Sequence, residues 1–378
     1  MPFPPSAPFR KKSNWLIALA TEAASPLLRA WARFRSGPPS DPRQWRKALI
    51  LGDNHIGDLL YRSASLQHLK AGLPQCEFHY LAAPGSSQVL EGNPAIASIL
   101  PWVRSDSPLD LAPEHLAALK AMRFDAALCT NCVKYWPELL LALRLGIPNR
   151  VGYVYKGFSA WVTRPIPIRY PQPYAAYFRD YVASLTDQQP AWSVRPIILG
   201  TPEDEAAASE LWKRLDLSRH GRVLACFMTT RQPTGAWPAE NFGKAFAILR
   251  SHFHIVLCGA AGDRQLLSSI DRDFDLKADI MAGDLSLRAL ACFLRRFHAV
   301  FTTDSGPRHI ANAAGVPVIF VRNVWFNAVE AGVYVDTETD LCGPPNDGDR
   351  GDGVALLAAI DPAAAAAAVV AAVADHVR

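Results

Sequence analysis

The sequence contains no uninterrupted apolar run of the ~20 residues that a membrane-spanning helix requires. The nearest candidate is residues 14–34, where apolar side chains can share one stripe of a helix and Lys and Arg flank it, but Pro26 should kink or split that helix. Two interpretations remain open for this stretch. It lies on an anionic membrane face as an amphipathic helix, or it packs on the protein's own surface.

Cysteine is scarce and irregularly placed. The seven cysteines form an odd, scattered set, which argues against a disulfide framework and for a reducing compartment. Cys129 and Cys132 form a lone C-x-x-C pair, and no second pair or histidine pair follows at ligand spacing. We therefore expect no metal site and no redox chemistry there.

The net positive charge of the chain comes from its N-terminal end. The formal net charge is +4, yet residues 1–46 hold eight lysines and arginines against two acidic residues, so the remainder is slightly acidic. A basic footprint over the folded body is missing, which argues against a nucleic-acid partner. The basic character belongs to an N-terminal extension.

What is present is an alternation of short apolar strands and amphipathic helices over 378 residues, enough for two domains. In the first half we predict strands at 47–51, 77–81 and 124–130, with helices at 58–71 and 137–145. In the second half we predict strands at 223–228, 254–258, 299–303 and 316–321, with helices at 239–250, 286–297 and 307–314. The fold class is therefore α/β, with two doubly wound sheets and a ligand site in the cleft between them.

Four segments follow from this alternation. They are a basic extension at 1–46, a first domain at 47–195, a second domain at 196–360 and an Ala-rich terminal helix at 361–378. The stretch from Tyr170 to Ala208 should hold the link between the domains.

The segment Asp304–His309 carries the clearest chemical signal. An apolar strand at 299–303 ends in polar residues, Gly306 allows a tight turn, and Pro307 suits the first turn of a helix. Free amides and the helix dipole at that point favour an anion such as a diphosphate, and Ser305 can cap the helix or donate to phosphate. A capped strand–turn–helix without a ligand remains the alternative.

The run from Asp304 to Val318 closely resembles the donor-site motif of glycosyltransferase family 9, the ADP-heptose:lipopolysaccharide heptosyltransferases. Further matches occur in the same order along the chain, at residues 53–60, 66–74, 92–94, 145–152, 237–242 and 283–287. The resemblance covers roughly residues 47–325. Several weak motifs in the right order are more specific than any one of them.

The resemblance implies a GT-B fold and an inverting, metal-independent transfer of a sugar from a nucleotide diphosphate donor, with ADP-heptose favoured and no cofactor. It makes Asp58 the general base that takes the proton of the acceptor hydroxyl. A helix N-cap is the alternative role of Asp58. Asp53 and Gly57 belong to the same acceptor-side loop, and Asp53 is the weaker candidate base.

The resemblance also implies a set of donor-binding residues. Arg231 is the expected cation for the leaving diphosphate, Asp304 would hold sugar hydroxyls, and Asp263 would bind ribose, although a solvated loop acid is an equal alternative for it. The full set is Thr229, Thr230, Arg231, Asp263, Leu285, Asp304, Ser305, Gly306, Pro307 and His309.

One position departs from the family pattern. Relatives usually have a lysine two residues before the Trp-Pro pair, whereas this chain has Gly235. Arg231 or Arg308 would compensate, or donor preference differs, or activity is lost. The sequence also contains D-x-D spacings at 271–275 and 347–349, which we interpret as solvated surface rather than as a metal site.

The partners implied by the resemblance are a nucleotide-sugar donor and a lipid-linked glycan acceptor, met at the cytoplasmic face of a bacterial inner membrane, where residues 1–46 would make a peripheral contact. Two other functions stay open. One is a binding or scaffold protein that keeps the fold but has lost catalysis, and the other is a nucleotide-sugar epimerase.

Overall fold

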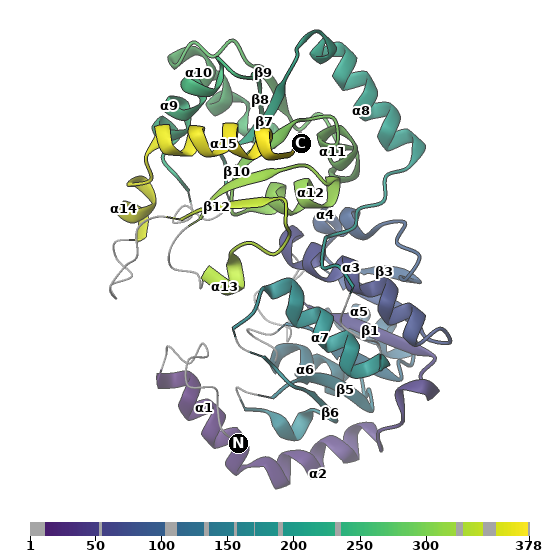
Figure 1. Ribbon diagram of the computed structural model, residues 1–378. Coiled ribbons are helices and arrows are strands. Elements are labelled where there is room, and N and C mark those ends of the chain that lie inside the picture. Colours follow the sequence, from purple (N-terminus) through teal and green to yellow (C-terminus); the bar gives the residue numbers. More distant parts are fainter. Residues whose placement is uncertain are drawn as a thin grey trace. The chain divides into compact units, whose positions relative to one another are not determined.

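The computed structural model describes residues 12–52, 55–102, 112–131, 136–154, 157–169, 171–187, 192–230, 236–322, 328–342 and 353–376. The chain divides into two compact units, Met1–Val194 and Arg195–Arg378 (Figure 1). Each unit contains one six-stranded sheet with helices packed around it. The predicted α/β class and the two doubly wound sheets are therefore confirmed.

The sheet of the first unit has the strand order β3-β2-β1-β4-β5-β6, and every neighbouring pair is parallel. Its central strands are buried apolar runs, as expected for a sheet that is covered on both faces. The strand order reverses between β1 and β4, and ligands bind beyond the carboxyl ends of strands at such a switch point. The strands are β1 (Lys47–Leu51), β2 (Glu77–Ala82), β3 (Ser98–Pro101), β4 (Ala126–Cys129), β5 (Asn149–Tyr153) and β6 (Arg164–Ile166).

Helices connect these strands, and two more precede the first of them. Helix α3 follows β1 directly and packs against α7. The helices are α1 (Lys12–Ala23), α2 (Ser25–Ser36), α3 (Ile56–Gly72), α4 (Pro84–Ser87), α5 (Pro113–Ala121), α6 (Trp136–Arg144) and α7 (Tyr174–Thr186), and the short 3₁₀ turns are η1 (Pro42–Gln44), η2 (Gln88–Leu90) and η3 (Ser159–Trp161). The break between α1 and α2 comes just before Pro26, as the sequence predicts.

The second unit repeats the same topology. Its sheet has the order β12-β11-β10-β7-β8-β9, again all parallel, and the reversal lies between β7 and β10. The strands are β7 (Val223–Phe227), β8 (His254–Gly259), β9 (Asp279–Ala282), β10 (Ala299–Thr303), β11 (Val318–Arg322) and β12 (Glu338–Cys342). Both sheets thus have the strand order of a dinucleotide-binding domain.

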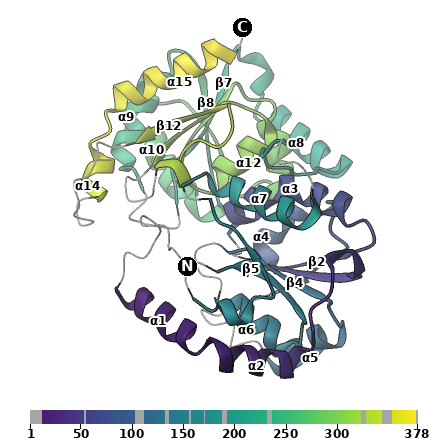
Figure 2. The same ribbon diagram turned by 60° about the horizontal axis from the view of Figure 1, so that its bottom comes forward.

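An aromatic core holds the helices of this unit to its sheet. Trp237 is 1% exposed and meets Phe242 edge-on at 4.7 Å, and Phe301 of β10 packs on both rings. The Trp-Pro motif of the sequence is therefore a core motif. The helices are α8 (Pro202–Arg214), α9 (Ala239–Leu249), α10 (Arg264–Asp273), α11 (Leu287–Leu294), α12 (Gly306–Ala314), α13 (Ala328–Ala331), α14 (Gly353–Ala358) and α15 (Pro362–His376), with 3₁₀ turns η4 (Leu217–Arg219) and η6 (Ala261–Asp263). Figure 2 shows α15 and α9 lying together along this sheet.

Several elements were absent from the sequence prediction. Strands β3, β6, β9 and β12 lie at the sheet edges and are only partly buried, so their apolar signal is weak. The fully buried strand β5 was also missed. The stretch from Tyr170 to Ala208, expected to hold the link, also contains α7 and the first turns of α8. The boundary between the units falls within it, at Val194.

A buried arginine fixes the position of α12 in the second unit. The Arg308 side chain is fully buried, and all five of its N–H groups donate. Nε and Nη2 form a two-pronged pair with Glu338 at 2.6 and 3.0 Å, Nη1 donates to Asp304, and Nη1 and Nη2 donate to the carbonyls of Ala331 and Gly332. This one side chain therefore links the start of α12 to β12 and α13.

The surroundings of this ion pair complete its hydrogen bonding. Glu338 also accepts from the side-chain amide of Asn312 at 2.7 Å and from the backbone N–H of Tyr334 at 2.9 Å. The ring of Phe320 lies 3.6 Å from the guanidinium carbon of Arg308. A buried charge pair is tolerated when its remaining donors and acceptors are satisfied in this way, whereas removal of one partner leaves an uncompensated charge.

We expect Arg308→Met to lower the free energy of unfolding of the second unit by about 3–5 kcal/mol, because the Glu338 carboxylate stays buried without its partner. Arg264→Met is the matched control. Arg264 also pairs with an aspartate, Asp284, at 3.1 Å, but half of its side chain is exposed, so its loss should be much smaller. Calorimetric unfolding of the full chain measures both. Equal shifts in the two variants would contradict the role assigned to Arg308.

His309 predicts a pH dependence of the same unit. Burial, and then the neighbouring Arg308 charge, lower the pKa of His309 well below 6.5. The unfolded chain therefore takes up the proton first, so the stability contributed by the neutral ring is full above about pH 6.5 and is lost as the pH falls below it. We expect His309→Gln to flatten the fall of the melting temperature between about pH 7 and pH 5. An unchanged slope would show that the ring does not stay neutral in the folded protein.

Candidate functional site

The predicted donor residues of the second unit gather at one edge of its sheet. Thr229 follows β7, Asp263 follows β8 and Asp304 follows β10. Since these strands are parallel, their carboxyl ends meet at the same edge. β7 and β10 are also the two strands between which the order reverses, where a doubly wound sheet binds its ligand.

Thr229 and Asp263 are in direct contact. The Thr229 hydroxyl donates to Oδ2 of Asp263 at 3.0 Å, and the backbone N–H of Ala260 donates to the same oxygen at 2.8 Å. Gly259 allows this approach, because a Cβ there would lie 2.8 Å from that oxygen. Asp263 is thus a positioned carboxylate at the end of β8, not the loosely solvated loop acid that was its alternative role.

The helix start at Ser305 is open at its amino end. Ser305 occupies the N-cap position of α12, but its side chain makes no bond to the helix amides; its hydroxyl instead accepts from the Thr303 hydroxyl at 2.9 Å. Gly306 and Pro307 form the first turn. Pro307 has no N–H, and the Arg308 N–H donates to the Ser305 carbonyl at 3.1 Å, so the Gly306 N–H and the helix dipole are what this helix start offers to an anion.

Asp304 lies beside this helix start and pairs with Arg308, whose guanidinium it shares with Glu338. Its Oδ1 accepts from Nη1 of Arg308 at 2.8 Å, and its side chain is 21% exposed. The contact orients the carboxylate while one oxygen is held from behind. Such a partly exposed acceptor is suited to hold hydroxyl groups.

Arg308 and His309 do not supply free cations to this helix start. Arg308 has all five donors engaged in the protein interior, so it replaces the absent lysine only if the buried network breaks. Nδ1 of His309 pairs with the Tyr334 hydroxyl at 2.9 Å, and burial lowers the pKa of the ring. Within the Asp304–His309 segment, positive potential at the helix start therefore comes from the backbone and the helix dipole.

Thr230 and Leu285 lie near the same edge. Thr230 comes directly after Thr229, and Leu285 precedes Ser286, whose hydroxyl caps α11 by accepting from the Ala289 N–H. Both side chains are partly exposed. Arg231 and Gly235 lie outside the described residues, so their predicted roles stay predictions.

In the first unit, Asp58 lies in the first turn of α3, which follows the carboxyl end of β1. His55 is the N-cap of this helix, so the alternative role of Asp58 as an N-cap does not hold. Asp58 is partly exposed, and Gly57 precedes it within the helix. Asp53, the other candidate base, lies outside the described residues.

Arg62 is a neighbour of Asp58 that the sequence analysis missed. Its side chain is buried beneath the helix start, and Nη1 donates to the Asp58 carbonyl at 2.9 Å and contacts the Tyr80 hydroxyl at 3.3 Å. Gly52 makes room for it, since a Cβ there would lie 2.8 Å from the guanidinium carbon. The i, i+4 spacing from Asp58 was the available signal.

The structure describes only part of the cysteine pair and of the acidic spacings. Cys129 is buried at the end of β4, and burial raises the pKa of its thiol well above the usual value; Cys132 lies outside the described residues. Asp271 is in α10 and accepts from the Ala278 N–H, and residues 347–349 are not described. Within the described ranges, no three His, Cys, Asp or Glu residues converge as metal ligands.

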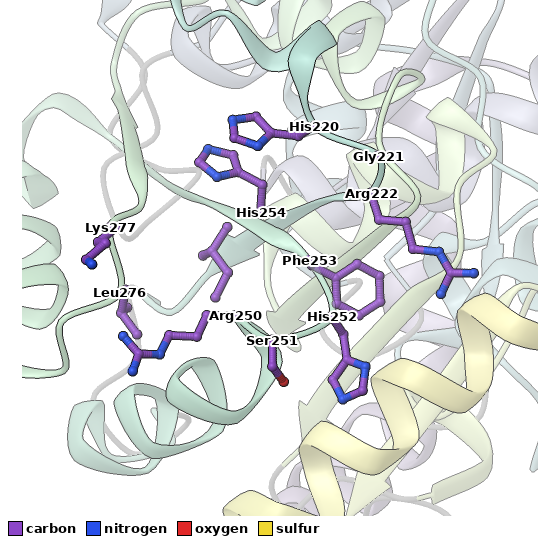
Figure 3. Close-up of a pocket in the computed structure, with 11 residues that line it drawn as sticks. His220, Gly221, Arg222, Arg250, Ser251, His252, Phe253, His254, Leu276 and Lys277 are labelled. Atoms are coloured by element: carbon purple, nitrogen blue, oxygen red, sulfur yellow. The ribbon is translucent and has the colours of Figure 1, made fainter.

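An open cavity of about 790 Å³ lies at the other edge of the same sheet, by the amino ends of β7 and β8 (Figure 3). The rings of His220 and His254 stack there at 3.6 Å, and Nε2 of His254 pairs with Asp279 at 2.7 Å. Arg222 and Arg250 belong to its lining. Because ligands of doubly wound sheets bind at carboxyl ends, this cavity is not the donor site.

Solved structures share this fold. A glycosyltransferase of family 9 from Veillonella parvula matches with a TM-score of 0.75 at 18% identity, over 89% of this chain and 98% of that one. The Escherichia coli heptosyltransferase WaaC with ADP-2-deoxy-2-fluoro heptose matches with a TM-score of 0.63 at 19% identity, over 85% and 98%. These likenesses identify the two sheets as the Rossmann-like domains of a GT-B fold.

Proteins of similar sequence belong to the same family as the proteins of similar fold. The lipopolysaccharide core heptosyltransferase OpsX of Haemophilus influenzae is 22% identical over 71% of this chain and 77% of its own length. The lipopolysaccharide heptosyltransferase 2 of Escherichia coli is 21% identical over 72% and 81%. The family profile described as glycosyltransferase family 9 (heptosyltransferase) matches residues 114–321, more than half of the sequence. The chain therefore belongs to glycosyltransferase family 9 and is a glycosyltransferase.

Proposed function

We propose that this enzyme transfers heptose from ADP-heptose to the lipopolysaccharide core or a related lipid-linked glycan, with inversion and without a metal ion. The observation that carries the proposal is the placement of the motif residues. Asp58 follows β1 and Asp304 follows β10, each at the strand-order reversal of its own sheet. The choice of heptose as the sugar and of lipopolysaccharide as the acceptor follows the relatives, which are described as lipopolysaccharide heptosyltransferases.

The reaction assigns a separate task to each unit. Asp58 accepts the proton of the acceptor hydroxyl as that oxygen attacks the anomeric carbon of the donor sugar. The bond from that carbon to the diphosphate breaks on the opposite face, which gives inversion. The start of α12, through its dipole and the Gly306 N–H, together with Thr229 and Thr230, receives the negative charge that builds on the leaving diphosphate.

The remaining donor residues orient the substrate. Asp304 holds sugar hydroxyls, and Asp263 binds the ribose with its charge directed by Thr229. Arg231 supplies the cation that relatives obtain in part from a lysine at the position of Gly235. Leu285, Gly306 and Pro307 shape the surrounding wall, and the buried His309 supports this wall from inside through its bond to Tyr334.

The acceptor places the enzyme at a membrane. Lipopolysaccharide core is built on a lipid, so we propose that the chain works at the cytoplasmic face of the inner membrane, with a peripheral contact through residues 1–46. A binding protein without catalysis is the second candidate, and Gly235 is the observation that favours it. Calorimetry with ADP- and UDP-sugars, followed by a turnover assay, separates the two, because binding without turnover is expected only of the second.

We expect Asp58→Asn to lower kcat by about 10²–10⁴-fold, because the amide cannot accept the proton. Donor affinity should stay near its original value. Asp187→Asn, at an exposed side chain at the end of α7, is the control and should leave both quantities unchanged. Calorimetry and a coupled release assay for ADP measure them. Full turnover in the Asp58 variant would remove it from the mechanism.

We expect ADP-heptose to raise the melting temperature in a panel of nucleotide sugars, since a ligand that binds only the folded state adds about 2.7 kcal/mol at a hundredfold excess over its Kd. Asp263→Asn keeps the shape and the acceptor for the Ala260 N–H but removes the charge, so it should weaken donor binding by about 1.5–3 kcal/mol. Asp273→Asn, exposed at the end of α10, is the control. A larger shift with another nucleotide sugar would reassign the donor.

A further inference from the structure

The exposed apolar side chains of this protein are concentrated on α1 and α2. Among the described residues, eleven large hydrophobic side chains are exposed, and six of them lie within residues 16–34. Leu27 is 78% and Phe34 is 89% exposed, the two highest values of the set. The six are Leu16, Ile17, Leu19, Leu27, Trp31 and Phe34. An apolar patch that remains this exposed indicates a partner.

Helix α1 is inverted with respect to an ordinary surface helix. Its polar residues Thr21 and Glu22 face the first unit: the Thr21 hydroxyl accepts from the Phe158 N–H at 3.2 Å, and Glu22 accepts from the N–H and the hydroxyl of Ser159 at 3.0 and 2.5 Å. Leu16 and Leu19 lie on the exposed side. A surface helix in water has the opposite arrangement. Helix α1 therefore presents apolar side chains on its outer side.

Helix α2 combines an apolar ridge with arginines. Leu27, Trp31 and Phe34 follow the i, i+4, i+7 spacing that places them on one side, and all three are exposed, whereas Ala32 is buried against the first unit. The helix also carries exposed Arg29, Arg33 and Arg35 and contains no acidic residue. The only acid of the two helices is Glu22, which is turned inward.

The two helices are held firmly to the first unit. Nη1 of the buried Arg150 donates to the Ser36 hydroxyl at 2.7 Å, at the end of α2, and Nε donates to the Trp161 carbonyl at 2.6 Å. Oδ1 of Asn149 accepts from the Ser40 N–H at 2.7 Å. Gly157 lets α1 approach, since a Cβ there would lie 2.8 Å from the Cα of Ala18. The exposed apolar face is therefore a fixed platform.

We propose that this α1–α2 platform, formed by residues 12–36, docks on the surface of an anionic lipid bilayer. The apolar side chains enter the region between the headgroups and the acyl chains, and Arg29, Arg33 and Arg35 meet lipid phosphates. No helix among the described residues has the length and apolar character to cross a bilayer, so the contact is peripheral. The inference rests on the proposed function for its lipid-linked acceptor and names the surface that meets that lipid.

The charge of the α1–α2 platform favours a lipid bilayer over a second copy of this chain as its partner. Two platforms pressed together would bring their arginines into one interface without an exposed acid on either helix to pair them. An anionic bilayer supplies the missing negative charge and accepts the apolar ridge as well. The bilayer is therefore the occupant that fits both features.

The test is flotation of the full chain with vesicles of phosphatidylcholine alone or mixed with phosphatidylglycerol. We expect binding to the anionic vesicles, weakened by salt, and a loss of about fivefold for each of Arg29→Gln, Arg33→Gln and Arg35→Gln. Leu27→Ser/Phe34→Ser should lower binding by at least about tenfold. The matched control is Ile248→Ser/Leu266→Ser, at two exposed apolar residues of the second unit, which should bind as the original protein does.

Three outcomes would overturn the proposal: no vesicle binding, equal binding to neutral vesicles with no effect of the arginine changes, or a platform variant that loses only self-association in ultracentrifugation. Flotation needs neither donor nor acceptor, and ADP release can be assayed with a detergent-soluble acceptor. Failure of the docking surface and failure of the proposed reaction therefore give different results. Circular dichroism of each variant confirms that the fold is retained.

Discussion

The buried pair of Arg308 and Glu338 is the interaction on which the second unit's site depends. The guanidinium draws the start of α12, the loop after α13 and the first residue of β12 together, and its remaining nitrogen holds Asp304 from behind. A diphosphate site needs backbone amides at fixed positions, because a helix dipole acts only within its first turn. The residue that looks most like a phosphate ligand in the motif is thus the one that positions the ligand-binding backbone. The charge of Arg308 stabilises the buried Glu338 carboxylate in the protein interior.

The two units place their polar site residues by the same structural arrangement. Each sheet reverses its strand order beside a central strand, and a glycine at a strand end lets a charged side chain come close to the backbone. Gly52 does this for Arg62 beneath Asp58, and Gly259 does it for Asp263 beside Thr229. In the second unit the bonded partners orient the Asp263 carboxylate itself, and in the first unit Arg62 holds the backbone of Asp58. Preorganisation of this kind favours catalysis, since nothing has to be rearranged when charge develops.

The N-terminal extension is bonded to the first unit by residues that lie within a sequence motif of the family. Asn149 and Arg150 lie in a stretch that resembles other members, yet here their side chains bind Ser40 and Ser36 of the extension. Burial lowers the pKa of Arg150 to about 10, and the carbonyls and hydroxyls around it compensate for the lost water. The added helices are thus anchored to the first unit and keep their apolar side outward.

The sequence by itself determined the α/β class, the central strands, most of the helices and the family, because buried parallel strands are continuous apolar runs and because glycine, proline and acidic residues at strand ends form motifs. The resemblance to the family also singled out Asp58, Asp263 and the Asp304–Pro307 segment, whose roles stay predictions. The sequence did not predict the edge strands, because strands that are only partly buried contain fewer apolar residues. Only the tertiary structure decided that Arg308 and His309 turn inward, that Arg62 lies beneath Asp58, and that Thr21 and Glu22 face the protein. Apart from the i, i+4 contacts of Arg62 with Asp58 and of Arg308 with Asp304, those outcomes depend on partners 18 to 137 residues away along the chain, which no local pattern identifies.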